Sequence, residues 1–256
     1  MYDIASVTSG CAGGIPWQME IHDLIDSTND RARELARGGA PHGTIVIADR
    51  QSGGHGRFQR AFYSPAGSGI YASIVLRPDA AIAQTAHITP MLAVAVARAI
   101  EACADVRARI KWVNDVYIET RKVCGILCVS GLDGAGRPYI VAGIGINVGR
   151  MEFPEPLSAI AGSISNAAGK IVSRDDVLMH LLNEISALYP QLEEGAFMTE
   201  YVERSNVVGC DVRVLRGDES FTARAERIDP ISGALIVRTE RGEIELSSGE
   251  VSLKFL

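Results

Sequence analysis

The chain has 256 residues, of which 47% are hydrophobic and 22% are charged, as in ordinary soluble globular proteins with a full core. Its formal net charge of −6 disfavours broad nucleic-acid binding, because that function needs a basic surface to displace the counterions of phosphates. The longest apolar run, residues 91–100, has about half of the length that a membrane-crossing helix needs.

Neither a secretory leader nor a disulfide framework is expected. The first residues lack a basic segment followed by a long apolar stretch. Five cysteines are scattered without the paired spacing of a metal site, and Cys124 and Cys128 stand in an apolar run that predicts buried strand positions. These features favour a reduced, cytoplasmic compartment.

The amino-terminal third of the chain predicts a flexible arm, three strands and one helix. Residues 1–16 are rich in small residues and are expected to form the arm, and residues 19–25 alternate like a strand. Ser27 can cap a helix that has an apolar stripe, and a glycine pair ends this helix. Two buried strands follow over residues 44–48 and 69–76.

The middle of the chain alternates helical and strand-like patterns. Residues 82–103 predict a helix that Pro90 splits or kinks, because proline removes a backbone donor. Three strand-like runs follow, and the last two flank a turn sequence suited to an antiparallel hairpin. These runs are residues 108–112, 123–130 and 139–148. Two more helices are expected over residues 175–189 and 197–203.

The pattern of apolar and polar residues changes after Ser205. Five short alternating runs, separated by turn residues, occupy residues 206–256. Strands at this spacing predict a small β-barrel. We therefore expect a domain of residues 1–205 followed by a barrel domain of residues 206–256.

A long segment between two predicted strands, residues 49–68, is rich in glycine and arginine. Glycine lets backbone N–H groups approach an anion closely, and arginine offers a planar fork to carboxylate or phosphate oxygens. Composition alone leaves open a flexible surface loop with solvated arginines. A segment of this length between rigid strands favours a function.

Two further segments carry polar residues beside apolar strands. In residues 111–122, two lysines bracket an Asn-Asp pair, and these side chains can ligate magnesium on a nucleotide. Residues 142–149 resemble a dinucleotide fingerprint only superficially, because Val148 stands where that motif needs glycine and no helical pattern follows. Glycines inside a strand indicate instead that a ligand lies close to the backbone.

The order of these motifs resembles that of the biotin–protein ligases. Ser27-Thr28-Asn29, the Gly/Arg loop, KWVND, RKVCGIL and GIGINVG follow one another before a small barrel, and the resemblance begins near residue 19. It implies an α+β fold, with a mixed sheet backed by helices of the class II synthetase-like kind and an SH3-like carboxy-terminal barrel. It also implies ATP-dependent activation of biotin to biotinyl-5'-AMP and transfer to a lysine of a carrier protein.

The resemblance implies roles for individual residues. Lys122 and Arg57 are the expected catalytic residues, because two anions meet in such a reaction and their repulsion must be offset. The implied biotin-binding residues are Ser27, Thr28, Asn29, Gln51, Gly54, His55, Gly56, Arg57, Lys122 and Gly125. The implied ATP-binding residues are Arg57, Arg60, Phe62, Lys111, Asn114, Lys122 and Asn147. Asn114 is the expected contact to Mg²⁺, through the nucleotide.

Several positions differ from the family pattern. His55 stands where the family has an arginine, and a neutral imidazole is a poorer partner for anions. Gln59 replaces a glycine, Phe62 replaces a tryptophan that would stack on adenine, Val113 replaces a proline, and Val129 replaces an acid. Phenylalanine still offers a stacking face.

Two alternatives remain at this point: a lipoate– or octanoate–protein ligase of the same fold, and a catalytically weakened biotin-binding protein. The expected partner is the biotin carboxyl-carrier domain of acetyl-CoA carboxylase or of another biotin-dependent enzyme. Roughly eighteen residues precede the first predicted strand, too few for the winged helix-turn-helix of repressor-type members, so no DNA binding is expected. The resemblance also allows a homodimer.

Overall fold

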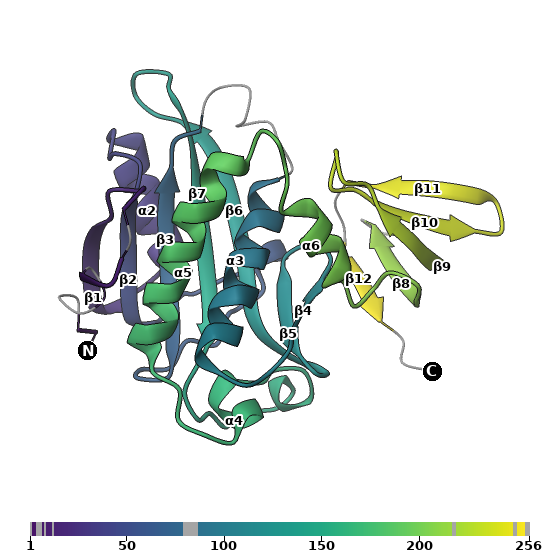
Figure 1. Cartoon of the computed structure of the whole chain (residues 1–256), viewed down its shortest axis with the longest axis horizontal. Helices are drawn as coiled ribbons and strands as arrows, with labels where there is room; N and C mark the ends of the chain where they lie inside the picture. The colour runs from purple at the N-terminus through teal and green to yellow at the C-terminus, as the bar shows by residue number, and fades with distance from the viewer. Residues whose placement is uncertain are drawn as a thin grey trace.

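The computed structural model describes residues 2–3, 7, 9–11, 13–78, 87–216, 219–247 and 250–253. Within these ranges, seven strands form a mixed sheet and five form a second sheet beside it (Figure 1). The main sheet has the spatial order β1 (Gln18–Ile25), β2 (Thr44–Gln51), β3 (Gly69–Leu76), β7 (Pro138–Asn147), β6 (Arg121–Leu132), β5 (Asp115–Ile118) and β4 (Ala108–Lys111). Strands β1 and β2 are parallel and the other neighbours are antiparallel, which confirms the predicted α+β fold.

Successive side chains of each strand point to opposite sides, so the main sheet has two different faces. In β3, Ile70, Ile74 and their neighbours on the same side enter the large core against α3 (Ile88–Cys103) and α5 (Arg174–Leu188). These two helices lie across the front of the sheet in Figure 1. Ser73 and Val75 point to the opposite face, where α2 (Thr28–Arg37) packs. That face carries the candidate site.

Helix α2 begins at the residue that the sequence predicts. The Ser27 hydroxyl accepts a hydrogen bond from the Asp30 N–H at 3.3 Å, which satisfies one of the free donors of the first turn. The helix ends at Gly38, whose N–H donates to Glu34 O at 3.1 Å. The cap fixes the direction in which Thr28 and Asn29 enter the site.

Three expectations need correction. Helix α3 runs unbroken from Ile88, and Pro90 lies in its first turn, where a missing N–H costs no intrahelical bond; the expected helical residues 82–86 lie outside the described residues. Strand β5 was not expected. The described part of the amino-terminal segment is packed rather than loose, because Tyr2 and Val7 are buried and the Tyr2 hydroxyl donates to Gly69 O at 3.0 Å.

The second sheet has the order β11 (Gly242–Leu246), β10 (Leu235–Thr239), β9 (Glu219–Ile228), β8 (Asp211–Arg216) and β12 (Glu250–Leu253), and all its neighbours are antiparallel. Strand β9 pairs with β8 through its first half and with β10 through its second half, so the sheet curls. In the described residues, the outer strands β11 and β12 do not pair with each other. The predicted barrel is therefore an open, SH3-like sheet.

The chain between the two sheets runs along the edge of the main sheet. The Ile110 N–H donates to Arg204 O at 2.9 Å, and the Asn206 N–H donates to Ile110 O at 3.0 Å. Helix α6 (Met198–Glu203) immediately precedes this connection. No helix in the described part of the chain combines the length and apolarity that a membrane crossing requires.

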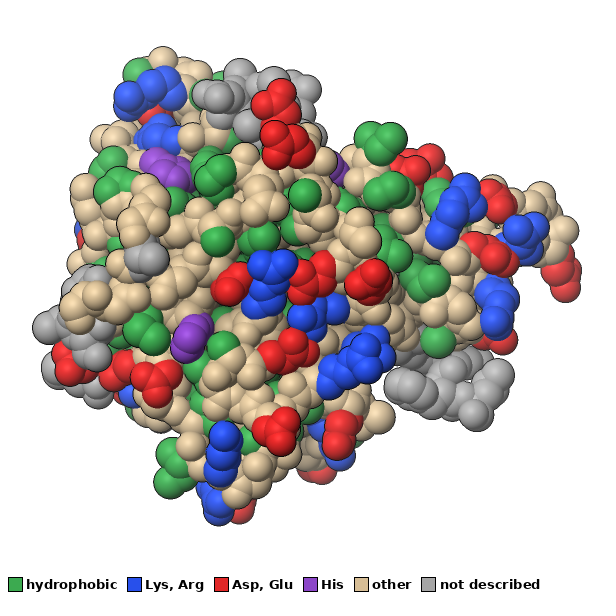
Figure 2. All heavy atoms as spheres, viewed as in Figure 1, with side chains coloured by type: hydrophobic (Ala, Val, Ile, Leu, Met, Phe, Trp, Pro, Cys, Tyr) green, Lys and Arg blue, Asp and Glu red, His purple; other side chains and the backbone are tan. Residues whose placement is uncertain are grey.

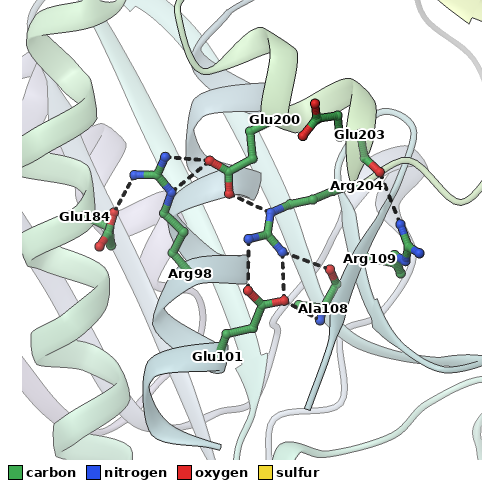
Figure 3. A network of polar contacts seen from close by, with 8 residues as sticks. All are labelled: Arg98, Glu101, Ala108, Arg109, Glu184, Glu200, Glu203 and Arg204. Carbon is green, nitrogen blue, oxygen red and sulfur yellow. Dashed lines mark hydrogen bonds and ion pairs between the residues drawn. The ribbon is translucent and has the colours of Figure 1, made fainter. Parts of the chain in front are cut away.

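A network of ion pairs holds α6 against the rest of the main domain (Figure 3). Arg98 of α3 pairs with Glu184 of α5 and Glu200 of α6. Arg204 pairs with Glu200 at 2.7 Å and with Glu101 at 2.8 Å. Figure 2 shows acidic and basic side chains intermingled over this face of the molecule. The network ties α3, α5 and α6 to one another and, through Arg204, to Ala108 at the start of β4.

Replacing Arg204 with methionine is expected to destabilise the fold by about 2 kcal/mol at pH 7, because two partly buried carboxylates lose a partner. Burial alone raises the pKa of Glu101, but hydrogen bonds from Arg204 and the Ala108 N–H outweigh it, and the pKa is lowered overall. This stabilisation is therefore present above the unfolded glutamate pKa of about 4.3 and is lost as the pH falls through the folded value. Urea unfolding between pH 7 and pH 3 should show a flatter pH dependence in the variant.

Arg109→Met is the matched control, because the Arg109 guanidinium donates to the backbone oxygen of Glu203. It should leave both the free energy of unfolding and its pH dependence nearly unchanged. Equal losses in the two variants would contradict a specific role for the network.

Candidate active site

A cavity opens on the α2 face of the main sheet, between the start of α2, the Gly/Arg loop and the ends of β4, β5 and β6. It gathers almost all of the residues predicted for the site. The predicted residues that line it are Ser27, Thr28, Asn29, Gln51, His55, Gly56, Arg57, Arg60, Phe62, Lys111, Asn114, Lys122 and Gly125. Segments far apart in the sequence therefore meet at one place.

One wall of the cavity is a chain of polar side chains. The backbone N–H and the hydroxyl of Thr28 are 2.9 and 3.1 Å from the Gln51 Oε1 that accepts from them. The Thr28 hydroxyl also lies 2.9 Å from that of Ser73, and Gln51 Nε2 donates to the Ser64 hydroxyl at 3.1 Å. These bonds fix the orientation of Gln51 and make the wall rigid.

Asn29 brings a buried acceptor to the same wall. Its side chain is 5% exposed, and its Oδ1 has no hydrogen-bond partner within the described residues. Its Nδ2 donates to Leu127 O across a long distance of 3.5 Å. Because buried polar atoms are nearly always paired, Asn29 Oδ1 fits a ligand that presents an N–H donor.

The Gly/Arg loop forms a small hairpin at the rim. His55 and Ala61 face each other in a bridge, and the Gly56 N–H donates to Arg60 O at 2.8 Å. At the tip, Phe58 and Gln59 have φ angles of 57° and 56°, in the left-handed region that favours glycine. This conformation accounts for the glycine that the family has at the position of Gln59.

Arg57 connects this loop to the segment between β4 and β5. Its Nη1 donates to Asn114 Oδ1 at 3.2 Å. The guanidinium carbons of Arg57 and Arg60 lie 5.1 and 5.9 Å from the centre of the Phe58 ring, within range of cation–π attraction. The loop is thereby tied across the cavity.

Lys122 and Asp115 form an ion pair in the cavity, with Nζ 2.7 Å from Oδ1. The Lys122 backbone is held on both sides, because its N–H donates to Ile160 O and its oxygen accepts from the Gly162 N–H, each at 2.9 Å. The side chains are 30% and 20% exposed. Asp115 thus fixes the ammonium group of Lys122 while leaving it accessible to a ligand.

The glycines of β6 and β7 make room for side chains of the protein itself. A Cβ at Gly145 would lie 2.6 Å from the Phe62 ring, and one at Gly143 would lie 2.7 Å from the Asn29 amide. Phe62 also meets Tyr71 edge-on, with ring centres 6.3 Å apart. Phe62 and Asn29 therefore fill part of the space beside these glycines, which also line the cavity, and the expectation that a ligand lies against them stays a prediction.

Two predicted residues lie away from the cavity lining. A Cβ at Gly54 would meet Gln51 Nε2 at 2.7 Å and the Ser64 hydroxyl at 2.9 Å, so this glycine makes room for the polar wall. Asn147 donates from Nδ2 to Gly162 O at 3.0 Å and joins the end of β7 to the segment beside Lys122.

The lining also contains residues that the motifs did not single out, among them Ser73 and Trp112, and Asp115 was expected only as a candidate partner of magnesium and not of Lys122. Ser73 is a fully buried hydroxyl in an otherwise apolar strand, and this contrast is a signal that the sequence carries. Asp115 and Trp112 stand inside the KWVND motif, in which the resemblance implies roles only for Lys111 and Asn114.

The electrostatics of the cavity favour an anion. Arg57, Arg60, Lys111 and Lys122 line it together with one carboxylate, that of Asp115, among the described residues. In the described part of the chain, no three His, Cys, Asp or Glu side chains gather into a metal site. The Asn114 amide accepts from Arg57 and donates to Ile126 O at 2.7 Å. These residues fit Mg²⁺ as a companion of nucleotide phosphates rather than in a protein cage.

The class of protein follows from two family models. Residues 21–147 match the biotin/lipoate A/B protein ligase family, and residues 209–254 match the biotin protein ligase C-terminal domain. These matches place one family domain on the main sheet and the other on the second sheet.

The relatives narrow this class. The bifunctional ligase/repressor BirA of Bacillus subtilis is 35% identical, over 91% of this chain and 73% of that protein. The biotin–[acetyl-CoA-carboxylase] ligase of Paracoccus denitrificans is 30% identical, over 88% and 96%. The biotin protein ligase of Aquifex aeolicus, solved in complex with biotin and ATP, has a TM-score of 0.79 at 30% identity, over 93% and 98%. The chain belongs to the biotin protein ligase family.

Proposed function

We propose that this chain activates biotin with ATP to biotinyl-5'-AMP and transfers the biotinyl group to a lysine of a carrier domain, as in acetyl-CoA carboxylase. The observation that supports this most is a single cavity with a neutral hydrogen-bonding wall at one side and four cations at the other. The wall suits a polar ring, and the cations suit a carboxylate and a phosphate. The A. aeolicus relative in complex with biotin and ATP supports the same pair of substrates.

The polar wall favours biotin over lipoate. The ureido ring of biotin carries N–H donors and a carbonyl acceptor, which match Asn29 Oδ1 and the Thr28–Gln51 chain. A dithiolane ring has neither, so binding lipoate would leave Asn29 Oδ1 without a partner, whereas Thr28 and Gln51 would keep their bonds to each other. An unpaired buried polar group costs about 1–3 kcal/mol, which is roughly a 10- to 100-fold preference for biotin from this atom.

In the first step, a carboxylate oxygen of biotin attacks the α-phosphorus of ATP, and the bond to the leaving pyrophosphate breaks. Lys122 would lie between the two anions, and its ion pair with Asp115, which holds the ammonium group in place, supports this role. Asn114 would hold Mg²⁺ through the nucleotide, and the ion would neutralise phosphate charge. The protein residues orient the two anions and offset their repulsion.

In the second step, the ε-amine of the acceptor lysine attacks the acyl carbon of the adenylate. The bond from this carbon to the phosphate oxygen breaks, AMP leaves with the electron pair, and the new amide nitrogen releases a proton. Until then the adenylate must be kept from water. The loop that Arg57 ties to Asn114 is placed to do this.

The test is pyrophosphate release by the purified chain with ATP, Mg²⁺ and either biotin or lipoate, followed by transfer of labelled biotin to a carrier domain. We expect release and transfer with biotin. Release with lipoate alone would overturn the proposal in favour of a lipoate ligase. Tight biotin binding by calorimetry without ATP-dependent transfer would instead identify a catalytically weakened binding protein.

A further inference from the structure

A turn of the second domain contacts a wall of the cavity. Trp112 lines the cavity and is 4% exposed, and its indole N–H donates to Gly233 O at 2.9 Å. Gly233 belongs to the turn between β9 and β10, 121 residues further along the chain. Among the described residues, none beyond 205 lines the cavity. The second domain therefore reaches the site through Trp112.

Asp229 organises this turn. Its Oδ1 accepts hydrogen bonds from the N–H groups of Ser232 at 2.7 Å and Ile231 at 2.9 Å, and these donors hold the pKa of Asp229 below its usual value. Its backbone N–H donates to Ala234 O at 2.8 Å, and its oxygen accepts from the Gly233 N–H at 2.9 Å. Gly233 has a φ of 70°, in the left-handed region that glycine adopts without strain. The turn thus presents the Gly233 oxygen in a defined direction.

The segment that receives this contact carries polar residues of the site. Val113, next to Trp112, accepts from the buried Tyr201 hydroxyl at 3.0 Å. The Asn114 side chain is fixed at both ends, because its Nδ2 donates to Ile126 O at 2.7 Å and its Oδ1 accepts a hydrogen bond from Arg57. Trp112 is the point at which the second domain adds its own constraint to this segment.

We propose that Asp229 is a positioning residue for the active site, which acts through Gly233 and Trp112 on the segment from Lys111 to Asp115. This rests on the proposed function, because the effect appears in biotin activation. The polar wall around Thr28 and Gln51 is held by its own hydrogen bonds and does not touch the turn. Loosening the turn therefore lowers kcat/KM for ATP more than it raises the KM for biotin.

Asp229→Ala tests the proposal by steady-state kinetics of pyrophosphate release. We expect about a tenfold fall in kcat/KM for ATP, since small misplacements of positioning groups slow such reactions strongly. Asp229→Asn keeps an oxygen acceptor for the two N–H groups and should restore the value to within about twofold of the parent. Failure of asparagine to rescue, or a normal KM and kcat for ATP in the alanine variant, would overturn the proposal.

Val237→Ala is the control for general destabilisation. Val237 is fully buried in the second sheet, and the substitution weakens that sheet without removing the turn. It should leave kcat/KM for ATP within about twofold of the parent at a temperature where the protein is folded. A tenfold loss in this variant too would show that the effect is only structural.

A spectroscopic readout separates this proposal from the proposed function. The chain has two tryptophans, so Trp17→Phe leaves Trp112 as the sole source of indole emission. In that background, Asp229→Ala should shift the emission to longer wavelength and Asp229→Asn should not. Unchanged emission would overturn the positioning role. A shift in a protein that activates neither biotin nor lipoate would retain the contact and refute only the proposed function.

Discussion

Replacing Lys122 with alanine is expected to lower the rate of biotin-dependent pyrophosphate release by about 100- to 1000-fold, the usual effect of removing one group that stabilises transition-state charge. Its Nζ lies 2.7 Å from Asp115, so the substitution also leaves a carboxylate in the cavity without its counter-ion. That carboxylate then repels the substrate carboxylate and the phosphates. Single-turnover measurements of pyrophosphate release and adenylate formation give this rate directly.

Two variants control for charge and folding. Lys170→Met removes one positive charge from an exposed position outside the cavity and should keep the parental rate. Lys122→Arg keeps the charge but changes its shape, and it should recover part of the loss. Pyrophosphate release at the parental rate in folded Lys122→Ala would remove this lysine from the mechanism.

Strong local patterns made much of the fold predictable. The run of apolar residues from Gly69 to Leu76 is bounded by polar turns, and β3 covers the same residues. The Ser27 cap is a local hydrogen bond between residues three apart, so the sequence alone specifies it. Strand β5 has four residues and a register shift against β6, and so short a strand leaves no periodic pattern. Whether the second sheet closes into a barrel depends on pairing between its outer strands β11 and β12, which the local sequence does not specify.

The candidate site was predictable as a set of motifs but not as a geometry. The pairing of Lys122 with Asp115 depends on β5, which the sequence did not predict, and on the register that brings β5 beside β6. The space at Gly145 serves Phe62, which lies 83 positions earlier in the chain. The contact of Trp112 with Gly233 links two domains. Such contacts follow from tertiary packing, so local spacing carries no signal for them.

Replacing Arg57 with glycine is expected to release the activated biotin before it reaches its carrier, so that unrelated proteins become labelled. In the structure, Arg57 Nη1 donates to Asn114 at 3.2 Å and its guanidinium lies 5.1 Å from the Phe58 ring centre. Both contacts tie the loop across the cavity. A charge-assisted hydrogen bond contributes about 1.5–3 kcal/mol, which corresponds to roughly 10- to 100-fold faster escape of the adenylate. Labelling of a protein mixture that lacks a carrier domain should rise by a similar factor.

The control variants separate the loss of the Arg57 contacts with Asn114 and Phe58 from the loss of a positive charge. Arg57→Lys keeps the charge without the planar fork, and labelling should fall between that of the parent and that of the glycine variant. Arg107→Gly removes an exposed arginine outside the cavity and should keep the parental selectivity. If Arg57→Gly still forms the adenylate but labels only the carrier domain, Arg57 does not retain the intermediate. Retention would then have to come from other contacts between the loop and the site, such as the packing of Phe62 on Gly145.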